Sequence, residues 1–532
     1  MELLLVGIDA ACARVTDPLV EDGRIPTLAQ LFDDGERGPL RSQIPPWTAS
    51  AWPSLYTGTN PGKHGVFGFL TFDGYDYDVV NATHVRERPL WHTLDHHGLS
   101  SVVVNVPVTG PPEPFDGALI PGYTAPETPA CHPEGVLDEV REAIGDYRVY
   151  PEWTGTDRTP TRDERVAAYC RLVEQRGSAF RYLTEQVDPD FGFVQFQQSD
   201  TVFHELPGDE AAVAEVYEAI DHEVDAILEA ADPRIVVVAS DHGMGRIGGS
   251  EYRVNEHLRR EGLVSATRGA GGMPEWGDVR DGTLTGDDKP SLAARAMATA
   301  ASVGITSQRL AGVLSTLRLA GVVQRLVPED VVRAGIERVD FPASQAYMRS
   351  RIECGVRINL AGREPAGVVS AAEYESLRDR LIDLFRSVET PEGDPVFELI
   401  ARREEVFDGP HVEDAPDVIV VPADFDQFLS AQLRESVFGE PREPYNHKWD
   451  GEIALSGAGT ESADLAGAHL FDVAPTILAL LDLPADERMD GRALVPETEE
   501  RIGYPAWDAG DRRETADETV EEHLEQLGYL DS

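Results

Sequence analysis

The sequence predicts an α/β fold, with a mostly parallel central sheet flanked by helices on both faces and a helical cap insertion. Short, continuously apolar runs alternate along the chain with stretches that carry apolar residues at helical spacing. Strands that are apolar on both faces are typical of parallel sheets covered by helices on each side. One further stretch, dense in Ala, Leu and Arg, has helical spacing without a strand pattern, and it predicts the cap.

The first predicted strand covers residues 3–8 and ends at Asp9. Later apolar runs predict strands at residues 101–106, 191–196, 235–239, 417–421 and 452–455. The helical patterns between them lie at residues 26–33, 91–97, 209–230 and 374–385. In sheets of this kind, ligands bind beyond the carboxyl ends of the strands. The residues at those ends are therefore the first candidates for a functional site.

The same patterns divide the 532 residues into four segments. Residues 1–261 form the first part of the core, and residues 346–499 form its second part. Between them, residues 262–345 hold the helical cap, which opens with a loop rich in Gly and Asp. Residues 500–532 form an acidic tail. A short docking helix is predicted in the tail by the apolar residues Val520, Leu524 and Leu527.

The charge balance is strongly acidic. The chain carries 95 Asp and Glu residues against 46 Lys and Arg, which gives a formal net charge of -49 at pH 7. Lysine occurs only at Lys63, Lys289 and Lys448, so the basic set is almost entirely arginine. Self-repulsion of this size weakens a compact state at ordinary ionic strength, whereas at ~1 M salt the Debye length falls to about 3 Å. The composition therefore predicts a halophilic protein.

Composition also excludes several classes of partner and location. A nucleic-acid groove needs a basic stripe, and the sequence has none. No apolar run approaches the ~18 residues of a membrane span, and the short apolar N-terminus lacks the basic flank of a signal peptide. The four cysteines form no C-x-x-C pair, which fits a reducing compartment. We therefore expect a cytoplasmic protein without a nucleic-acid or membrane partner.

Polar side chains of the metal-ligand type lie at or beside the predicted strand ends. They are Asp9, Asp200, His204, Asp241, His242 and His447. The spacing of four between Asp200 and His204 places both on one face of a helix. Since the carboxyl ends of parallel strands meet at one edge of a sheet, these side chains are expected to converge. Asp and His together are ligands for divalent cations.

A hydroxyl group lies at the start of a predicted helix. Thr48 follows Pro45, Pro46 and Trp47, and proline disfavours α geometry in the residue before it, so the helix is expected to begin near Thr48. A helix N-terminus gathers free N–H groups and favours anions. An isolated Thr in this place is more often a helix cap. Because the sequence also contains the ligand-type residues named above, Thr48 is a candidate nucleophile.

Together these motifs resemble the alkaline phosphatase superfamily and, within it, the type I phosphodiesterases and nucleotide pyrophosphatases. That family has a strand-end Asp, a Thr or Ser nucleophile ahead of a T-G-x-x-P-x-x-H-G turn, a D-x-x-x-H pair, a D-H-G triplet and a late His. In this chain the turn runs from Thr57 to Gly65. The other motifs correspond, in the same order, to Asp9, Thr48, Asp200 with His204, Asp241-His242-Gly243 and His447.

The resemblance implies an alkaline-phosphatase-like fold and a site for two divalent metal ions. The ligands of one metal would be Asp200, His204 and His447. The ligands of the other would be Asp9, Asp241, His242 and the hydroxyl oxygen of Thr48. Zinc is favoured by this set of His and Asp ligands, and manganese also suits it.

The implied activity is hydrolysis of a small phosphoric ester. A threonine hydroxyl is a weak nucleophile, and coordination to a divalent cation lowers its pKa. Thr48 would attack phosphorus in line, and hydrolysis of the resulting phospho-threonine would give net retention at phosphorus. A phosphomonoesterase or phosphomutase on the same scaffold is an alternative, and so is a catalytically silent protein that binds metal and ligand. The intact nucleophile and ligand set argue against the silent protein.

Contacts to the substrate are less defined than the ligand set. In the nucleotide pyrophosphatases that the chain resembles, an Asn three residues after the nucleophile helps to bind a phosphoryl oxygen. This chain has Ala51 at that position, so the preference between diester and monoester stays open. Lys63 in the turn and Arg363 in a later arginine-rich stretch could supply such a contact. The sequence leaves the physiological substrate and the oligomeric state open.

Overall fold

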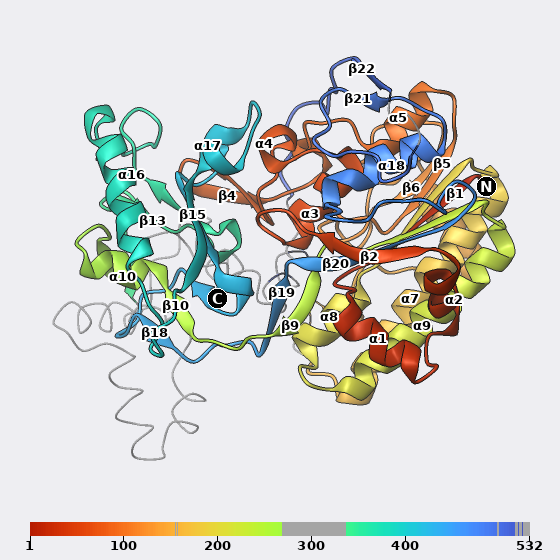
Figure 1. Cartoon of the computed structure of the whole chain (residues 1–532), viewed down its shortest axis with the longest axis horizontal. Coiled ribbons are helices and arrows are strands. Elements are labelled where there is room, and N and C mark those ends of the chain that lie inside the picture. Colours follow the sequence, from red (N-terminus) through yellow and green to blue (C-terminus); the bar gives the residue numbers. More distant parts are fainter. Residues whose placement is uncertain are drawn as a thin grey trace.

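A computed structural model describes residues 1–154, 156, 158–268, 337–496, 500–515, 520 and 524 of the chain. Two lobes lie side by side (Figure 1). The larger one, the core lobe, is formed by residues 1–246 together with the described residues from 445 onward. The second lobe is formed by the described residues between 250 and 440. Within the described residues, no helix has the length and hydropathy needed to cross a membrane.

The core lobe is built on a seven-stranded sheet. Its strands are β1 (Leu3–Ile8), β2 (Glu36–Arg41), β5 (Ser101–Val104), β6 (Gly117–Ile120), β7 (Phe191–Phe196), β8 (Ile235–Ala239) and β20 (Asp450–Gly457). They are ordered β2-β20-β8-β1-β7-β5-β6. The run from β8 to β6 is parallel. At the edge beside β8, β20 pairs antiparallel with β8, and β2 pairs antiparallel with β20. The predicted fold class, a mostly parallel sheet between helices, is confirmed.

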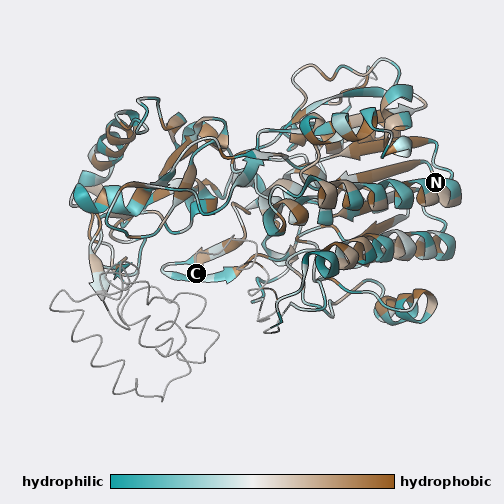
Figure 2. Ribbon diagram, turned by 90° about the horizontal axis from the view of Figure 1, so that it is seen from below, coloured by the Kyte–Doolittle hydropathy of each residue, from teal (hydrophilic) through white to brown (hydrophobic). Residues whose placement is uncertain are grey.

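Helices cover both faces of this sheet (Figure 1). One face packs against α3 (Thr48–Thr57), α5 (Leu90–His96) and α18 (Val473–Leu480). The other packs against α1 (Ala13–Glu21), α2 (Pro26–Asp34), α6 (Val136–Ile144), α7 (Arg162–Val187) and α9 (Glu210–Ala231). Strand β1 feeds both layers, because Leu3 and Leu5 point to the first face while Leu4 and Val6 point to the second. Figure 2 shows the strands as a hydrophobic layer between these helices.

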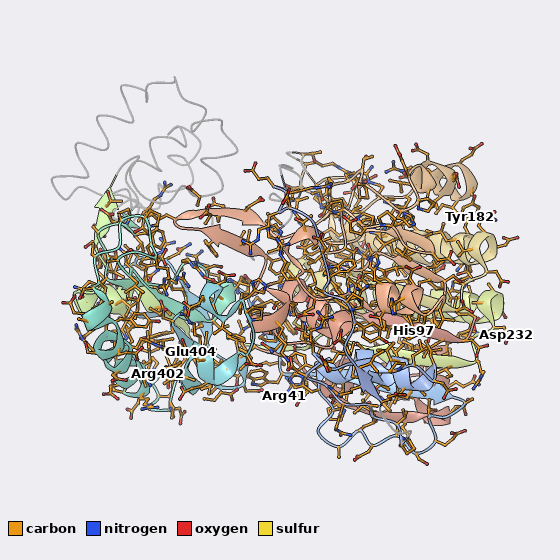
Figure 3. The ribbon with its side chains drawn as sticks, turned by 90° about the horizontal axis from the view of Figure 1, so that it is seen from above. Arg41, His97, Tyr182, Asp232, Arg402 and Glu404 are labelled. Carbon is orange, nitrogen blue, oxygen red and sulfur yellow. The ribbon has the colours of Figure 1, made fainter. Side chains whose placement is uncertain are left out.

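The second lobe has its own sheets and its own core. Its main sheet has the order β13-β14-β16-β15, and a smaller one has the order β17-β10-β18. Strands β11 and β12 form a separate pair. The strands of this lobe are β10 (Glu251–Arg253), β11 (Ala266–Arg268), β12 (Glu337–Val339), β13 (Ala346–Tyr347), β14 (Gly355–Ile358), β15 (Phe397–Arg402), β16 (Val418–Pro422), β17 (Phe428–Ser430) and β18 (Phe438–Gly439). The helices are α10 (Val254–Arg260), α16 (Ala371–Arg386) and α17 (Arg403–Val406). In Figure 3, the labelled Arg402 and Glu404 lie in this lobe.

The run at residues 417–421, predicted as a strand of the central sheet, is instead β16 of the second lobe, where its neighbours are antiparallel. An apolar run indicates that a strand is buried, but it does not indicate which sheet the strand joins. That is decided by pairing between segments that are distant in the sequence. The second lobe extends to both sides of the predicted cap boundaries at residues 262 and 345. Most of the predicted helical cap, residues 269–336, lies outside the described residues. In the predicted tail helix, Val520 and Leu524 are helical and buried, and Leu527 lies outside the described residues.

A two-stranded antiparallel ribbon, here called the neck, joins the lobes. It consists of β9 (Gly243–Arg246) and β19 (Tyr445–Lys448), with His447 opposite Met244. The chain leaves the core lobe after β9 and returns to it through β19. A hairpin of the core lobe, β3 (Leu70–Asp73) and β4 (Asp76–Val79), also reaches the second lobe, because the hydroxyl of Tyr75 in its turn donates to Asn359 at 2.7 Å.

Candidate active site

The ligand-type residues converge at the carboxyl edge of the central sheet. Asp9 follows β1, Asp241 and His242 follow β8, and α8 (Gln198–Glu205), which carries Asp200 and His204, follows β7. The side chains of these residues are buried. His447 was expected just ahead of a strand, yet it lies within β19 of the neck. It reaches the same edge because β20, which comes next, runs antiparallel to β8.

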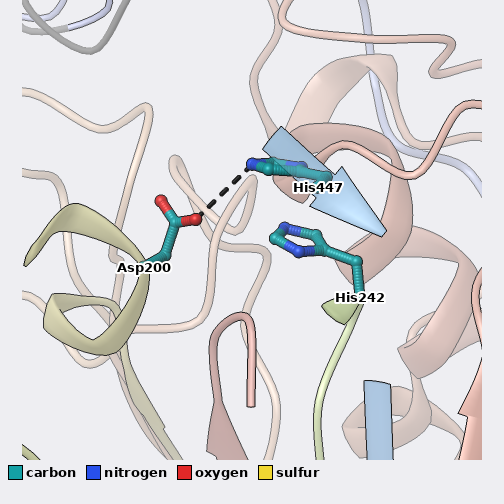
Figure 4. A group of neighbouring side chains, drawn as sticks. All are labelled: Asp200, His242 and His447. Atoms are coloured by element: carbon teal, nitrogen blue, oxygen red, sulfur yellow. Dashed lines mark ion pairs between the residues drawn. The ribbon is translucent and has the colours of Figure 1, made fainter. Parts of the chain in front are cut away.

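Three side-chain atoms form a nearly equilateral triangle. Oδ1 of Asp200 lies 3.4 Å from Nε2 of His204 and 3.4 Å from Nε2 of His447, and the two histidine nitrogens are themselves 3.4 Å apart. Tetrahedral ligands with bonds of about 2.0–2.1 Å lie roughly 3.3–3.4 Å from each other. The triangle therefore has the dimensions of one face of a tetrahedral metal site. Figure 4 shows Asp200 and His447 on either side of this space, with His242 beside them.

A second group surrounds His242. Its Nε2 lies 3.5 Å from Oδ1 of Asp9, 3.2 Å from Oδ2 of Asp241 and 3.4 Å from Oγ1 of Thr48. The imidazole rings of His242 and His447 stack with centroids 3.6 Å apart, so the two groups adjoin. Oδ1 of Asp9 and Oδ2 of Asp241 are buried and have no hydrogen-bond donor among the described residues. Their geometry leaves two carboxylate oxygens aimed at one point without a protein donor.

The electrostatics of the site call for added positive charge. Burial, together with Asp241 and Asp200, holds the pKa of Asp9 well above its ordinary value. Burial and Asp200 likewise raise the pKa of Asp241. Neither Asp9 nor Asp241 forms an ion pair with Lys or Arg within the described part of the chain. Buried charges are retained when they are paired or coordinate a metal, so this donor set fits divalent cations.

The histidines differ from one another because of their surroundings. Burial, reinforced by His447, lowers the pKa of His242 well below its usual range. Burial acts on His204 in the same direction, but Asp200 and Glu443 outweigh it and raise the pKa of His204 to about 10. A neutral imidazole is the form that binds metal, and His242 is held in that form by the protein alone.

Several supporting residues escaped the sequence analysis. Nε1 of Trp52 and Nε2 of Gln195 both donate to Oδ2 of Asp9, at 3.0 and 2.9 Å, and so hold Oδ1 toward His242. The imidazole of His447 contacts the backbone oxygen of Pro46 through Nδ1 at 2.8 Å. Glu443 lies 3.5 Å from Nδ1 of His204. Such partners orient ligating groups. For Gln195 a signal existed, since it is the polar residue within an otherwise apolar strand.

Thr48 is the first residue of α3, after Trp47 in extended conformation, and it is fully buried.

His64 lies in the turn that follows α3, and its hydrogen bonds show a structural role. The backbone N–H of Val66 donates to Nδ1 of His64, so Nε2 carries the proton and donates to Ser54 at 2.8 Å. Ser54 in turn donates to Gln43, whose amide donates to the carbonyl of Pro45. His64 therefore supports the turn that precedes the nucleophile candidate.

The two residues suggested for substrate contacts have partners outside this cluster. Lys63 forms an ion pair with Asp490 and donates to the carbonyl of Arg488 at 2.9 Å. Arg363 belongs to the second lobe, where it pairs with Asp417 at 2.7 Å and with Glu364 at 2.9 Å. Both side chains are engaged in structural ion pairs, so neither is brought into the metal-type cluster.

Comparison with known proteins gives one family and one fold. The model of the family described as type I phosphodiesterase / nucleotide pyrophosphatase matches residues 3–432. Phosphonoacetate hydrolase from Sinorhizobium meliloti 1021, solved with phosphonoacetate, aligns with a TM-score of 0.54 at 14% identity, over 89% of this chain and 94% of that chain. Wild-type alkaline phosphatase PafA aligns with a TM-score of 0.52 at 13% identity, over 92% of this chain and 98% of that one. No curated protein sequence matches the chain.

Proposed function

Since the chain belongs to the type I phosphodiesterase/nucleotide pyrophosphatase family of the alkaline phosphatase superfamily, and is thus a hydrolase of phosphoric esters, we propose that Thr48 is its nucleophile. The observation that carries this proposal is the distance of 3.4 Å between Oγ1 of Thr48 and Nε2 of His242, inside the group that includes Asp9 and Asp241. A hydroxyl in that place shares its neighbours with the candidate metal ligands.

We propose that two divalent cations complete the site. One would be held by Asp200, His204 and His447, and the other by Asp9, Asp241, His242 and Thr48. When bound, the cations supply positive charge that favours the ionised Thr48 hydroxyl and offsets charge on phosphoryl oxygens. The spacing of 3.4 Å among Asp200, His204 and His447 supports zinc, and manganese suits the same ligand types.

Thr48, Trp52 and Gln195 have separate roles in the proposed hydrolysis. Thr48 gives up its hydroxyl proton to solvent and forms a bond from Oγ1 to phosphorus while the bond to the leaving ester oxygen breaks, and the ester oxygen takes up a proton from solvent. Water then cleaves the phospho-threonine, so two in-line displacements leave net retention at phosphorus. Trp52 and Gln195 keep Asp9 oriented throughout, because both bind the carboxylate oxygen that faces away from His242. The helix N-terminus at Thr48 adds backbone N–H groups that favour the anionic substrate.

The partner that we propose is a small phosphate ester. The predicted cap at residues 262–345 would cover the site and select among such esters. The acidic composition supports work in concentrated salt, where its net charge of -49 is screened. Four free cysteines support a reducing location, and we propose the cytoplasm.

The proposal is tested by turnover of an aryl phosphodiester and an aryl phosphomonoester in concentrated potassium chloride, with zinc, with manganese and with chelator. We expect Thr48→Ala to lower kcat by about 1000-fold or more, because loss of a nucleophile removes the covalent route. Thr57→Ala is the matched control, since Thr57 is a buried threonine at the other end of α3 that donates to Pro53.

Each outcome decides something. Metal-dependent diester cleavage that needs Thr48 supports the phosphodiesterase assignment. Cleavage of the monoester alone would favour a phosphomonoesterase or phosphomutase. Full activity in Thr48→Ala would contradict the nucleophile, and no turnover of any ester by the metal-loaded wild type would favour a silent binding protein.

A further inference from the structure

A chain of side-chain amides runs along the carboxyl edge of the central sheet beside Asp9. Asn105 lies directly after β5, Gln195 lies in β7 and Gln197 follows that strand. Nδ2 of Asn105 donates to both the backbone oxygen and Oε1 of Gln195, at 3.0 and 2.8 Å. Nε2 of Gln195 then donates to Oδ2 of Asp9 at 2.9 Å and to Oε1 of Gln197 at 3.2 Å.

The direction of these hydrogen bonds is fixed from both ends. A backbone carbonyl can only accept, so the Asn105 atom facing Gln195 is the amide nitrogen, and the Gln195 atom facing Asn105 is the oxygen. The other end of Gln195 is then its nitrogen, which matches the Asp9 carboxylate as an acceptor. That nitrogen requires an oxygen from Gln197. The remaining polar atom of Gln197, Nε2, is therefore a donor pointing away from the chain of amides.

This donor is buried and unused. Gln197 is only 4% exposed, and its Nε2 has no acceptor among the described residues. Buried polar groups in native proteins are almost always hydrogen-bonded, so each exception needs an explanation. The Gln197 carboxamide cannot turn over to hide its donor, because rotation would place two N–H groups of Gln195 and Gln197 against each other.

Gln197 lies level with the candidate active site. The backbone N–H of Asp9 donates to the carbonyl of Phe196 at 3.1 Å, which places Gln197 beside Asp9 at the strand ends. The side chains of residues 195 and 197 lie on the same side of the sheet edge. Gln195 and Trp52 of α3 both donate to Oδ2 of Asp9. Helix α3 begins with Thr48. The free N–H thus lies at the sheet edge that carries Asp9, on the residue that directly precedes α8, the helix of Asp200 and His204.

We propose that Nε2 of Gln197 donates a hydrogen bond to a phosphoryl oxygen of the bound substrate. This inference rests on the proposed function, since it assumes that phosphorus is attacked by Thr48. It supplies a contact that Ala51 cannot make, from a residue on a different strand. An N–H that is oriented before the substrate arrives adds binding without a further ordering cost.

Two substitutions test the donor. Gln197→Met keeps the length of the side chain and removes both polar atoms, and Gln197→Glu keeps an acceptor for Gln195 while replacing the donor with an anionic oxygen. Gln427→Met is the matched control, because Gln427 is a buried glutamine of the second lobe whose Oε1 accepts from Ser250. Each protein is loaded with zinc, its metal content is measured, and inorganic phosphate is titrated by calorimetry alongside aryl diester turnover.

We expect Gln197→Met to weaken phosphate binding and lower kcat/KM by about 10- to 100-fold, which is typical of a lost hydrogen bond to a charged group. Gln197→Glu should be weaker still, while Gln427→Met stays within about 2-fold of wild type. Metal content should be equal in all of them.

Unchanged phosphate affinity in folded Gln197→Met would overturn the inference, and so would a loss of zinc, which would mean that Gln197 acts through Asp9. If Gln197→Met does not fold, Gln197→Glu decides on the same criteria. A wild type that binds phosphate through Gln197 but turns over no ester would contradict the proposed function and leave the contact standing.

Discussion

Asp241 of the core lobe and Asp417 of the second lobe are the same residue type, and each is 0% exposed. Their surroundings are opposite. Asp417 accepts from Arg363 at 2.7 Å, from the hydroxyl of Tyr374 at 2.6 Å and from the backbone N–H of Ile358 at 2.6 Å, and Arg403 lies 3.1 Å away. Asp241 has an oxygen with no donor among the described residues and faces other carboxylates.

The pKa values of the two carboxyls record this difference. Burial raises the pKa of Asp241, and the nearby Asp200 raises it further. Burial acts on Asp417 in the same direction, but Arg363, Arg357 and Arg403 outweigh it and hold its pKa well below the usual range. A buried acid that the protein neutralises by itself is a structural element. One that has no basic partner and lies among other acids is a place for a cation from outside.

The strongest test of this comparison removes the charge of Asp241. We expect Asp241→Asn to lower kcat by about 1000-fold, because the residue belongs to the proposed metal ligands, while the metal-free protein loses no stability. Wild type should gain thermal stability when zinc is added, by about 2.7 kcal/mol at 100 times Kd for each site, and the variant should gain less. Thermal melting with and without zinc measures both. A variant that melts much earlier without metal would show that Asp241 is a structural acid like Asp417.

Removing the charge of Asp417 should have the reverse effect. We expect Asp417→Asn to cost about 3 kcal/mol of unfolding free energy at pH 7, because the buried Arg403 and the half-buried Arg363 lose their shared acceptor, while kcat of the folded protein is retained. The folded pKa of Asp417 is depressed, so its contribution to stability is present above the unfolded pKa of about 3.9 and is lost as pH falls through the folded pKa.

The difference between wild type and Asp417→Asn should therefore narrow as the pH falls below about 4. Urea unfolding at pH 7 and at pH 3 in concentrated potassium chloride measures it. A constant difference at both pH values would show that the aspartate charge does not contribute.

The smallest effect is expected at Lys63. Its ion pair with Asp490 is partly exposed and lies outside the group of candidate metal ligands. Lys63→Met should therefore lower the free energy of unfolding by less than about 1 kcal/mol and change kcat/KM only slightly. Diester kinetics and thermal melting of the variant check this. A loss of kcat/KM beyond about 10-fold at unchanged stability would return Lys63 to the substrate contacts.

The fold class and the set of candidate residues could be predicted from the sequence, because both are local properties. Leu3 to Ile8 is apolar at every position, which indicates a strand buried on both faces, and Asp9 follows it directly. Asp200 and His204 are four residues apart, and a helix brings them to one face wherever it lies. The order of motifs along the chain was enough to indicate the family.

Other features depend on contacts between segments far apart in sequence. The apolar sequence of β16 resembles the sequences of the strands in the central sheet. Its antiparallel partners β14 and β15 place it in the second lobe. His447 belongs to the neck because β19 pairs with β9, two hundred residues earlier in the chain. Arg363 was a candidate for a substrate contact in the sequence, and the structure pairs it with Asp417 instead.

By itself, then, the sequence determined which side chains are available and which strands and helices carry them, because periodicity and strand ends are properties of neighbouring residues. Only the tertiary structure decided which buried acids are neutralised by arginine and which face one another. It also fixed the direction of the amides from Asn105 to Gln197. The physical reason is that charge pairing and hydrogen-bond direction act over a few ångströms in space, between residues that the chain separates widely.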